Sequence, residues 1–175
     1  MIALDENLVG EWSGLNAEIE RVYEETRAAI CSYLLYLGVP SNQAQEVTQE
    51  VFLRLYQTMK KGSAINNLRG WLFRVAHNQG LRVRQRERPF RVVGPDWQQI
   101  SSAAEATDEA LISRQRSARV AAAMETLSPQ QRHCLYLRSE GLRYREIAEV
   151  VGISASSVNE FLRRAIARLA EAANE

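Results

Sequence analysis

Cysteine, histidine and proline are scarce in this chain, whose 175 residues include only two cysteines, two histidines and four prolines. Cys31 and Cys134 are far apart in the sequence, and neither belongs to a CxxC or Cys/His cluster. We therefore expect each to fill a helix face rather than to form a disulfide or bind a metal. His77 and His133 are equally isolated, so the sequence predicts no zinc site. It also has no glycine-rich phosphate loop, and we expect no cofactor and no catalytic residues.

Long apolar runs are also absent. None approaches the roughly 20 residues that a membrane-spanning helix needs. The N-terminal stretch MIALDENLVGEW lacks the basic start and apolar core of a signal peptide. With 46% hydrophobic and 25% charged residues, the composition is that of a soluble globular protein. These absences predict a cytoplasmic protein without membrane insertion.

The net charge of +1 conceals a strong segregation of charge. Residues 1–30 carry seven acidic side chains and two arginines, whereas residues 69–91 carry seven arginines and one acid. Residues 92–109 carry four acids and no basic residue, and residues 111–170 carry ten arginines against five acids. Two basic blocks separated by an acidic one indicate two surfaces for a polyanion. The alternative, that the arginines simply solvate helix faces, suits Arg114, Arg116 and Arg119.

Apolar residues recur at intervals of three and four, so an all-α fold is expected. A first helix is predicted to end at Gly38 and Pro40, and a second to run from Ser41 or Asn42 to about Gly62. The apolar positions expected to face the core of these two helices are Leu15, Ile19, Val22, Tyr23, Ile30, Leu34 and Leu37, then Ala44, Val47, Val51, Leu55 and Met59. Asn67 is expected to cap a third helix that ends at Pro89. Its predicted buried face is Leu68, Trp71, Leu72, Val75 and Ala76.

The pattern breaks between the two basic blocks, where Gly94-Pro95 and Ser101-Ser102 are typical of a linker. The sequence therefore predicts two small helical domains, 1–91 and 110–175, joined by a linker over 92–109. Helix formation resumes near Asp108 and is expected to reach Thr126. The next helix is predicted to begin at Ser128-Pro129-Gln130-Gln131, with Ser128 and Gln131 forming a capping box, and to end near Ser139.

The stretch Tyr144–Phe161 has the spacing of a DNA-binding helix-turn-helix. Ala148 is small enough for close helix packing, and Gly152 can take the left-handed conformation that ends a helix. Ser154 is placed to cap a second helix expected over about 155–170. The expected buried positions of the motif are Ile147, Val151, Ile153, Val158, Phe161 or Leu162, and Leu169. A helical hairpin without DNA binding has similar spacing, but the arginines that follow favour DNA.

Two segments of the chain resemble the same family. The segment Leu127–Leu169, LSPQQRHCLYLRSEGLRYREIAEVVGISASSVNEFLRRAIARL, is similar to region 4 of bacterial sigma factors. The segment Gln43–Gln57, QAQEVTQEVFLRLYQ, with Trp71-Leu72 and Ala76-His77-Asn78, is similar to region 2. A short chain with only these two regions resembles the extracytoplasmic-function group, group IV.

The resemblance implies a role for each region. Region 2 would dock on the β′ clamp helices of core RNA polymerase through Glu46, Gln49, Glu50, Phe52 and Arg54. It would meet the −10 element through Arg74, Asn78, Arg82, Arg84 and Arg86. Region 4 would bind the β flap and read the −35 element through Arg143, Ser156, Ser157, Asn159, Glu160, Arg163, Arg164 and Arg168. An anti-sigma factor is a further partner that the family implies.

Some positions depart from the family pattern. An acidic residue is usual where this chain has Arg82, and a lysine is frequent at the position of Asn159. Glu160 stands where a small polar residue is common, and Phe161 and Ile166 replace frequent basic residues. Because phosphates repel a carboxylate, we expect Glu160 to discriminate between bases, accepting from cytosine.

We rank three classes of function by how well the sequence supports them. A promoter-specificity subunit without catalytic residues is the leading hypothesis. The alternative is a stand-alone helix-turn-helix regulator that dimerises through its N-terminal helices and binds half-sites about one helical turn apart. An enzyme is a distant third, because the one carboxylate pair at helical spacing, Glu46 and Glu50, has no partner base or metal ligand.

Overall fold

The computed structural model describes residues 6–86 and 108–174, with side chains from residue 16 in the first stretch and from residue 114 in the second. Within these stretches the chain is all-helical, as predicted, with seven helices and no strand. The helices are α1 (Glu6–Tyr36), α2 (Ser41–Lys60), α3 (Leu68–Arg86), α4 (Asp108–Glu125), α5 (Pro129–Ser139), α6 (Tyr144–Val151) and α7 (Ala155–Asn174).

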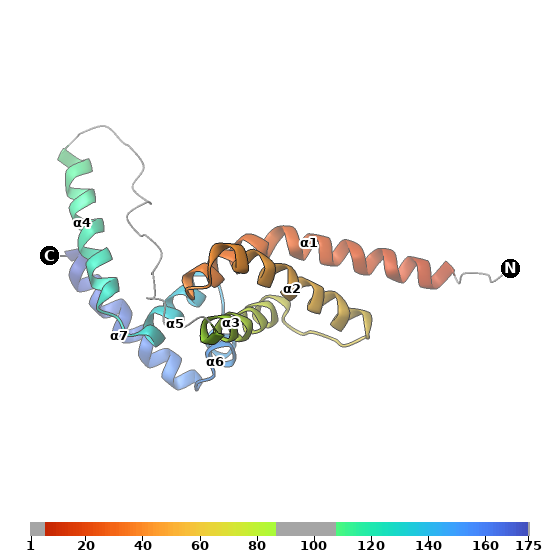
Figure 1. The fold of residues 1–175 in the computed structure, drawn as a ribbon. Coiled ribbons are helices and arrows are strands. Elements are labelled where there is room, and N and C mark those ends of the chain that lie inside the picture. The colour runs from red at the N-terminus through yellow and green to blue at the C-terminus, as the bar shows by residue number, and fades with distance from the viewer. Residues whose placement is uncertain (1–5, 87–107, 175) are drawn as a thin grey trace. The chain divides into compact units, whose positions relative to one another are not determined.

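The chain divides into two compact units, Met1–Val92 and Val93–Glu175. The first contains α1 to α3 and the second α4 to α7 (Figure 1). The predicted helix start at Asp108 is confirmed. Most of the predicted linker and the predicted helix end at Pro89 lie outside the described residues.

The core of the first unit forms where α1, α2 and α3 pack on one another (Figure 1). Tyr33 and Phe73 are fully buried there, with ring centroids 5.3 Å apart. Gly80 lets α3 approach α1 closely, because a methyl group at this position would lie 3.0 Å from side-chain carbons of both Leu34 and Leu37. The predicted core positions that prove buried are Val22, Ile30, Leu34, Leu37, Ala44, Val47, Val51 and Leu55.

The buried face of α3 differs from the expected one. Asn67 caps the helix as predicted, since its Oδ1 accepts from Gly70 N at 3.1 Å. Leu72 and Ala76 are buried, but Leu68, Trp71 and Val75 are only half-buried. The other buried positions of this helix are Phe73, His77, Gln79 and Gly80. The helix is therefore rotated about its axis relative to the prediction, and Trp71 lies at the edge of the core.

His77 is a buried titratable group in this core. Its Nδ1 lies 2.8 Å from the hydroxyl of Tyr33, which is also buried. Burial lowers the pKa of His77 below its ordinary value, because a charged imidazolium loses its hydration there. His77 is therefore expected to stay neutral in the folded protein at neutral pH.

Acidification is expected to destabilise the first unit through His77. Its unfolded-state pKa is about 6.5 and its folded-state pKa is lower, so the unfolded chain binds the proton first. The free energy of unfolding should fall as the pH drops below about 6.5, until the folded-state pKa is reached. The measurement is the melting temperature at about pH 7.5 and at about pH 5.5. Between these two pH values the melting temperature of the wild type should fall by more than that of the His77→Gln variant. Equal losses in the two proteins would contradict this account.

The second unit is built on local signals that the sequence predicted. Ser128 Oγ accepts from Gln131 N at 3.2 Å, and Gln131 Oε1 accepts from Ser128 N at 2.9 Å. This is the predicted capping box at the start of α5, with Pro129 in the first turn. Within the unit, α7 packs against α4, α5 and α6 (Figure 1). The buried positions include Leu127, Cys134, Leu137, Leu142 and Ile147.

Candidate nucleic-acid and protein interfaces

Helices α6 and α7 form the predicted helix-turn-helix. Gly152 takes a left-handed conformation with φ of 76° after the last turn of α6. The amides of Gly152 and Ile153 donate to the carbonyl of Ala148 at 2.9 and 3.1 Å. Ser154 Oγ then accepts from Ser157 N at 3.0 Å, which caps α7. The turn therefore depends on the residues that the spacing singled out.

The buried side of the motif fixes the direction of α7. Val158 and Leu162 are buried as expected, whereas Phe161 and Leu169 are only half-buried. On α6, Ile147 and Val150 are buried, while Val151, which the sequence favoured, is half-buried. The recognition helix is also longer than predicted, since it continues to Asn174.

The opposite side of α7 carries most of the residues predicted to read DNA. Asn159, Arg163 and Arg164 are exposed, as is Ser156 in the first turn. Ser157 is half-buried, and its hydroxyl lies 2.8 Å from Ser154 Oγ. These residues recur at intervals that place them on neighbouring faces of one helix. Side chains at the N-terminal end of a recognition helix are those that reach base edges in the major groove.

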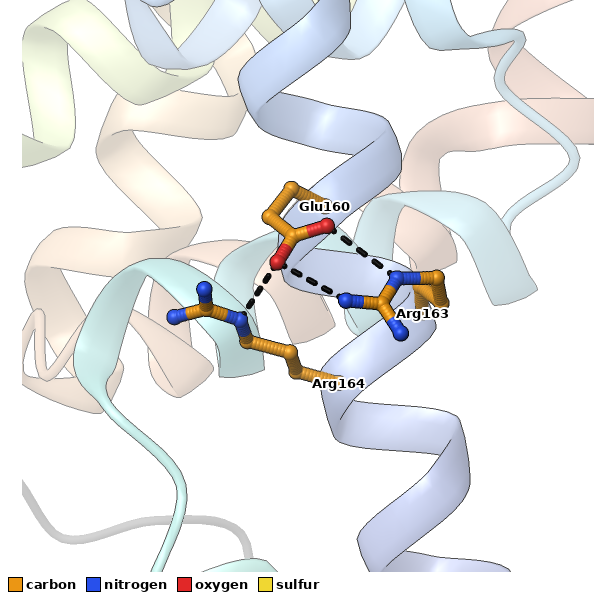
Figure 2. A network of polar contacts seen from close by, with 3 residues as sticks. All are labelled: Glu160, Arg163 and Arg164. Carbon is orange, nitrogen blue, oxygen red and sulfur yellow. Dashed lines mark hydrogen bonds and ion pairs between the residues drawn. The ribbon is translucent and has the colours of Figure 1, made fainter.

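Glu160 is engaged with two arginines of the same helix (Figure 2). Arg163 donates through Nε to Oε2 at 3.1 Å and through Nη2 to Oε1 at 3.0 Å. Arg164 donates through Nε to Oε1 at 2.6 Å. The hydrogen bonds from Arg163 and Arg164 hold the pKa of Glu160 below its ordinary value. Both carboxylate oxygens therefore have guanidinium partners within the protein, which the sequence analysis did not anticipate.

Arg168 and Arg143, the other two arginines predicted to contact the −35 element, do not pair with Glu160. Arg168 Nη1 donates to the carbonyl of Thr126 at 3.1 Å, beyond the end of α4. This contact joins α7 to the chain that follows α4, and the rest of the Arg168 side chain is exposed, so its predicted phosphate contact stays a prediction. Arg143 is exposed immediately before α6, and its backbone amide donates to Glu146 Oε2 at 2.7 Å. Its predicted contact with DNA stays a prediction.

A second basic surface lies on α3. Asn78, Arg82 and Arg86 are exposed, and Arg74 is half-buried. Together with Trp71 these positions follow a spacing of three and four residues, which puts them on one side of the helix. Arg84 is half-buried on a different side, and its Cδ would lie 3.8 Å from a methyl group added at Gly38. The structure therefore separates Arg84 from the predicted basic set and adds the indole of Trp71 to that side.

The exposed side of α2 carries the predicted protein-binding residues, with one correction. Glu46, Gln49, Glu50 and Arg54 are exposed. Phe52 is buried, and its ring packs edge-on against Tyr23 with centroids 4.8 Å apart, so it cannot contact a partner directly. The aliphatic residue exposed on this side is Leu53, at 55%. Leu53 lies two residues from both Val51 and Leu55, so the apolar period places it on the solvent side of α2, although it was not predicted as a partner-binding residue.

Neither a metal cluster nor a membrane-spanning helix occurs among the residues that the structure describes. Cys31 and Cys134 are free thiols. Burial raises the pKa of Cys134 to about 11, which keeps this thiol protonated at neutral pH.

One unit holds a helix-turn-helix with an arginine-rich recognition helix, and the other bears a basic helix. This combination is typical of DNA-binding proteins that act in transcription. Two family models match, Sigma-70 region 2 over residues 22–89 and Sigma-70 region 4 over residues 117–169. The chain is 31% identical over 157 residues to the ECF RNA polymerase sigma factor SigL of Mycobacterium tuberculosis, covering 87% of each chain. It is 25% identical over 150 residues to the RNA polymerase sigma factor YlaC of Bacillus subtilis, covering 84% of this chain and 87% of the relative.

Two solved structures share the fold. One is CnrH in complex with the cytosolic domain of CnrY, with a TM-score of 0.58 and 22% identity, covering 91% of this chain and 89% of that one. The other is the sigma factor RpoE in complex with the anti-sigma factor NepR from Bartonella quintana, with a TM-score of 0.57 and 20% identity, covering 89% and 96%. The chain belongs to the ECF family of RNA polymerase sigma factors, which direct transcription initiation and are not themselves enzymes.

Proposed function

We propose that each unit recognises a different part of the promoter, and that the first unit also docks on core polymerase. The exposed side of α2 docks on the β′ clamp helices of core polymerase, and the basic side of α3 engages the −10 element. The helix-turn-helix binds the −35 element, and its unit contacts the β flap. This division assigns residues 1–91 to polymerase docking and −10 contact, 92–109 to the linker and 110–175 to the −35 element. As a specificity subunit the chain needs no catalytic group of its own.

The exposed side of α3 supports the −10 assignment most directly. Arg82 and Arg86 carry positive charge that neutralises phosphates, and Asn78 can form hydrogen bonds with bases. Trp71 adds an aromatic surface of the kind on which unpaired bases stack. Such a combination suits a strand whose bases are being separated better than an intact duplex.

The recognition helix supports the −35 assignment. Ser156, Ser157, Asn159, Glu160 and Arg163 are the residues that we place nearest base edges. An asparagine can form two hydrogen bonds with adenine, and an arginine can do so with guanine. Arg143 and Arg164 are placed to contact phosphates, which set the register of the helix on the duplex.

An anti-sigma factor is a further proposed partner. CnrH and RpoE were solved in complex with CnrY and with the anti-sigma factor NepR, respectively. A regulator of this chain would block initiation by covering the exposed side of α2, because polymerase needs the same surface.

Removing Arg82 and Arg86 is expected to weaken binding of the polymerase complex to all promoters alike. Each lost phosphate contact should flatten the logarithmic dependence of the affinity on salt by roughly 0.7–0.9 units, because fewer counterions are released. The measurement is a titration of promoter DNA with polymerase and the full chain across a range of salt concentrations. Arg84→Ala is the matched control on the same helix, since Arg84 is half-buried on another side. An unchanged slope in the Arg82→Ala/Arg86→Ala variant would show that these arginines only solvate α3.

A further inference from the structure

Gln79 is a buried polar residue of α3 that faces the charged residues of α2. It is only 6% exposed. When its amide is oriented to satisfy both neighbours, its nitrogen donates to Glu50 Oε2 at 3.2 Å and its oxygen accepts from Arg54 Nε at 3.0 Å. The reverse orientation would place oxygen against the carboxylate and nitrogen against the guanidinium. One amide therefore matches both charged groups at once.

Glu50 and Arg54 also pair with each other. Arg54 Nη2 lies 2.7 Å from Glu50 Oε1, and the two side chains are 46% and 50% exposed. An exposed ion pair one helical turn apart is weak and exchanges with water. The contacts with Gln79 change this, because a neutral amide held in the core gives each charged group a second partner in a fixed direction. Glu50 and Arg54 are thus each held by Gln79 through one polar atom, while about half of each side chain stays exposed to solvent.

We propose that Gln79 is a positioning residue for polymerase docking, which holds Glu50 and Arg54 in the conformation that meets polymerase. The inference rests on the proposed docking role of α2. A long charged side chain loses conformational freedom when it joins an interface, and a side chain held in place beforehand loses less. Gln79 touches no polymerase itself, and it acts only through its two partners on α2.

The first test is the affinity of the full chain for core polymerase when Gln79 is replaced by Met. This change keeps the length of the side chain and removes both hydrogen bonds. The dissociation constant should rise about three- to tenfold, because Glu50 and Arg54 must then be ordered during binding. Gln85→Met is the matched control, since it makes the same change at an exposed position of α3. An affinity equal to that of the wild type would overturn the proposal.

A double-mutant cycle separates positioning from a general effect on the fold. In a background of Glu50→Ala/Arg54→Ala, Gln79→Met should cause no further loss of affinity, because the residues through which it acts are absent. An equal loss in both backgrounds would make Gln79 a packing residue and overturn the inference. If Glu50→Ala/Arg54→Ala has no effect by itself, the proposed docking surface is wrong, and the inference fails with it.

A second substitution keeps the test decisive if Gln79→Met does not fold. Gln79→Glu retains the acceptor for Arg54 but puts a like charge against Glu50 in place of a donor. Circular dichroism reports the fold, and the polymerase affinity should again be lower than that of the wild type. A folded Gln79→Glu variant with full affinity would overturn the proposal.

Discussion

Leu53→Asp is expected to weaken binding to core polymerase by at least about tenfold, or about 1.4 kcal/mol. Leu53 is 55% exposed on the side of α2 that also carries Gln49 and Glu50. Apolar area that an interface removes from water favours binding roughly in proportion to that area, so an exposed leucine on a docking surface is expected to contribute to the affinity. A carboxylate at the same place would have to lose its hydration without a partner, which opposes binding.

The fold should survive this change. Because Leu53 is exposed, its replacement should alter the free energy of unfolding by less than about 1 kcal/mol. Leu35→Asp is the matched control, since Leu35 is 42% exposed in the same unit but lies on α1. Equal affinities of the Leu53→Asp variant and the wild type for polymerase would remove α2 as the docking surface. If Leu35→Asp lowers the affinity for polymerase as much as Leu53→Asp does, the loss is not specific to α2, and the docking assignment loses its support.

Glu160→Ala is expected to raise the affinity for duplex DNA in general and to relax the preference at one base pair of the −35 element. The general gain follows from removing a negative charge that binds both Arg163 and Arg164. The loss of preference follows from the geometry of Arg163, whose Nε and Nη2 face Glu160 and so leave Nη1 for DNA. The expected change in discrimination is about 1–3 kcal/mol.

The contribution of Glu160 can be separated from a simple change in charge. Glu171→Ala removes one exposed carboxylate from the same helix, about three turns away, and should leave the base preference unchanged. In an Arg163→Ala background, Glu160→Ala should no longer alter the preference, because the arginine that it orients is absent. The measurement is a selection from a promoter library in which every −35 position varies. An unchanged preference in Glu160→Ala would show that Glu160 plays no part in reading the sequence.

The features that the sequence predicted well depend on neighbouring residues. The capping box of Ser128 and Gln131 forms within one turn of helix, and the left-handed Gly152 needs only its own backbone freedom. The helix-turn-helix could therefore be located to within a few residues. The arrangement as two all-helical units likewise follows from the apolar period and from the break after the first basic block.

The features that the sequence predicted poorly depend on distant residues. Trp71 and Phe73 both suit the core, and the close approach of α3 to α1 at Gly80 favours burial of Phe73. Phe52 was assigned to a partner, yet it packs on Tyr23 from another helix. Arg168 finds its acceptor 42 residues away in the chain. Periodicity fixes which residues share a side of a helix, but only packing decides which side is buried.

Transcription in vitro with core polymerase, the full chain and a promoter library tests the central claim most directly. Core polymerase alone should start without sequence preference, and adding the chain should direct initiation to promoters that share two separate elements. Substitutions in either element should lower initiation. If the chain instead binds a symmetric site as a dimer and leaves initiation by core polymerase unchanged, the account of a promoter-specificity subunit is contradicted.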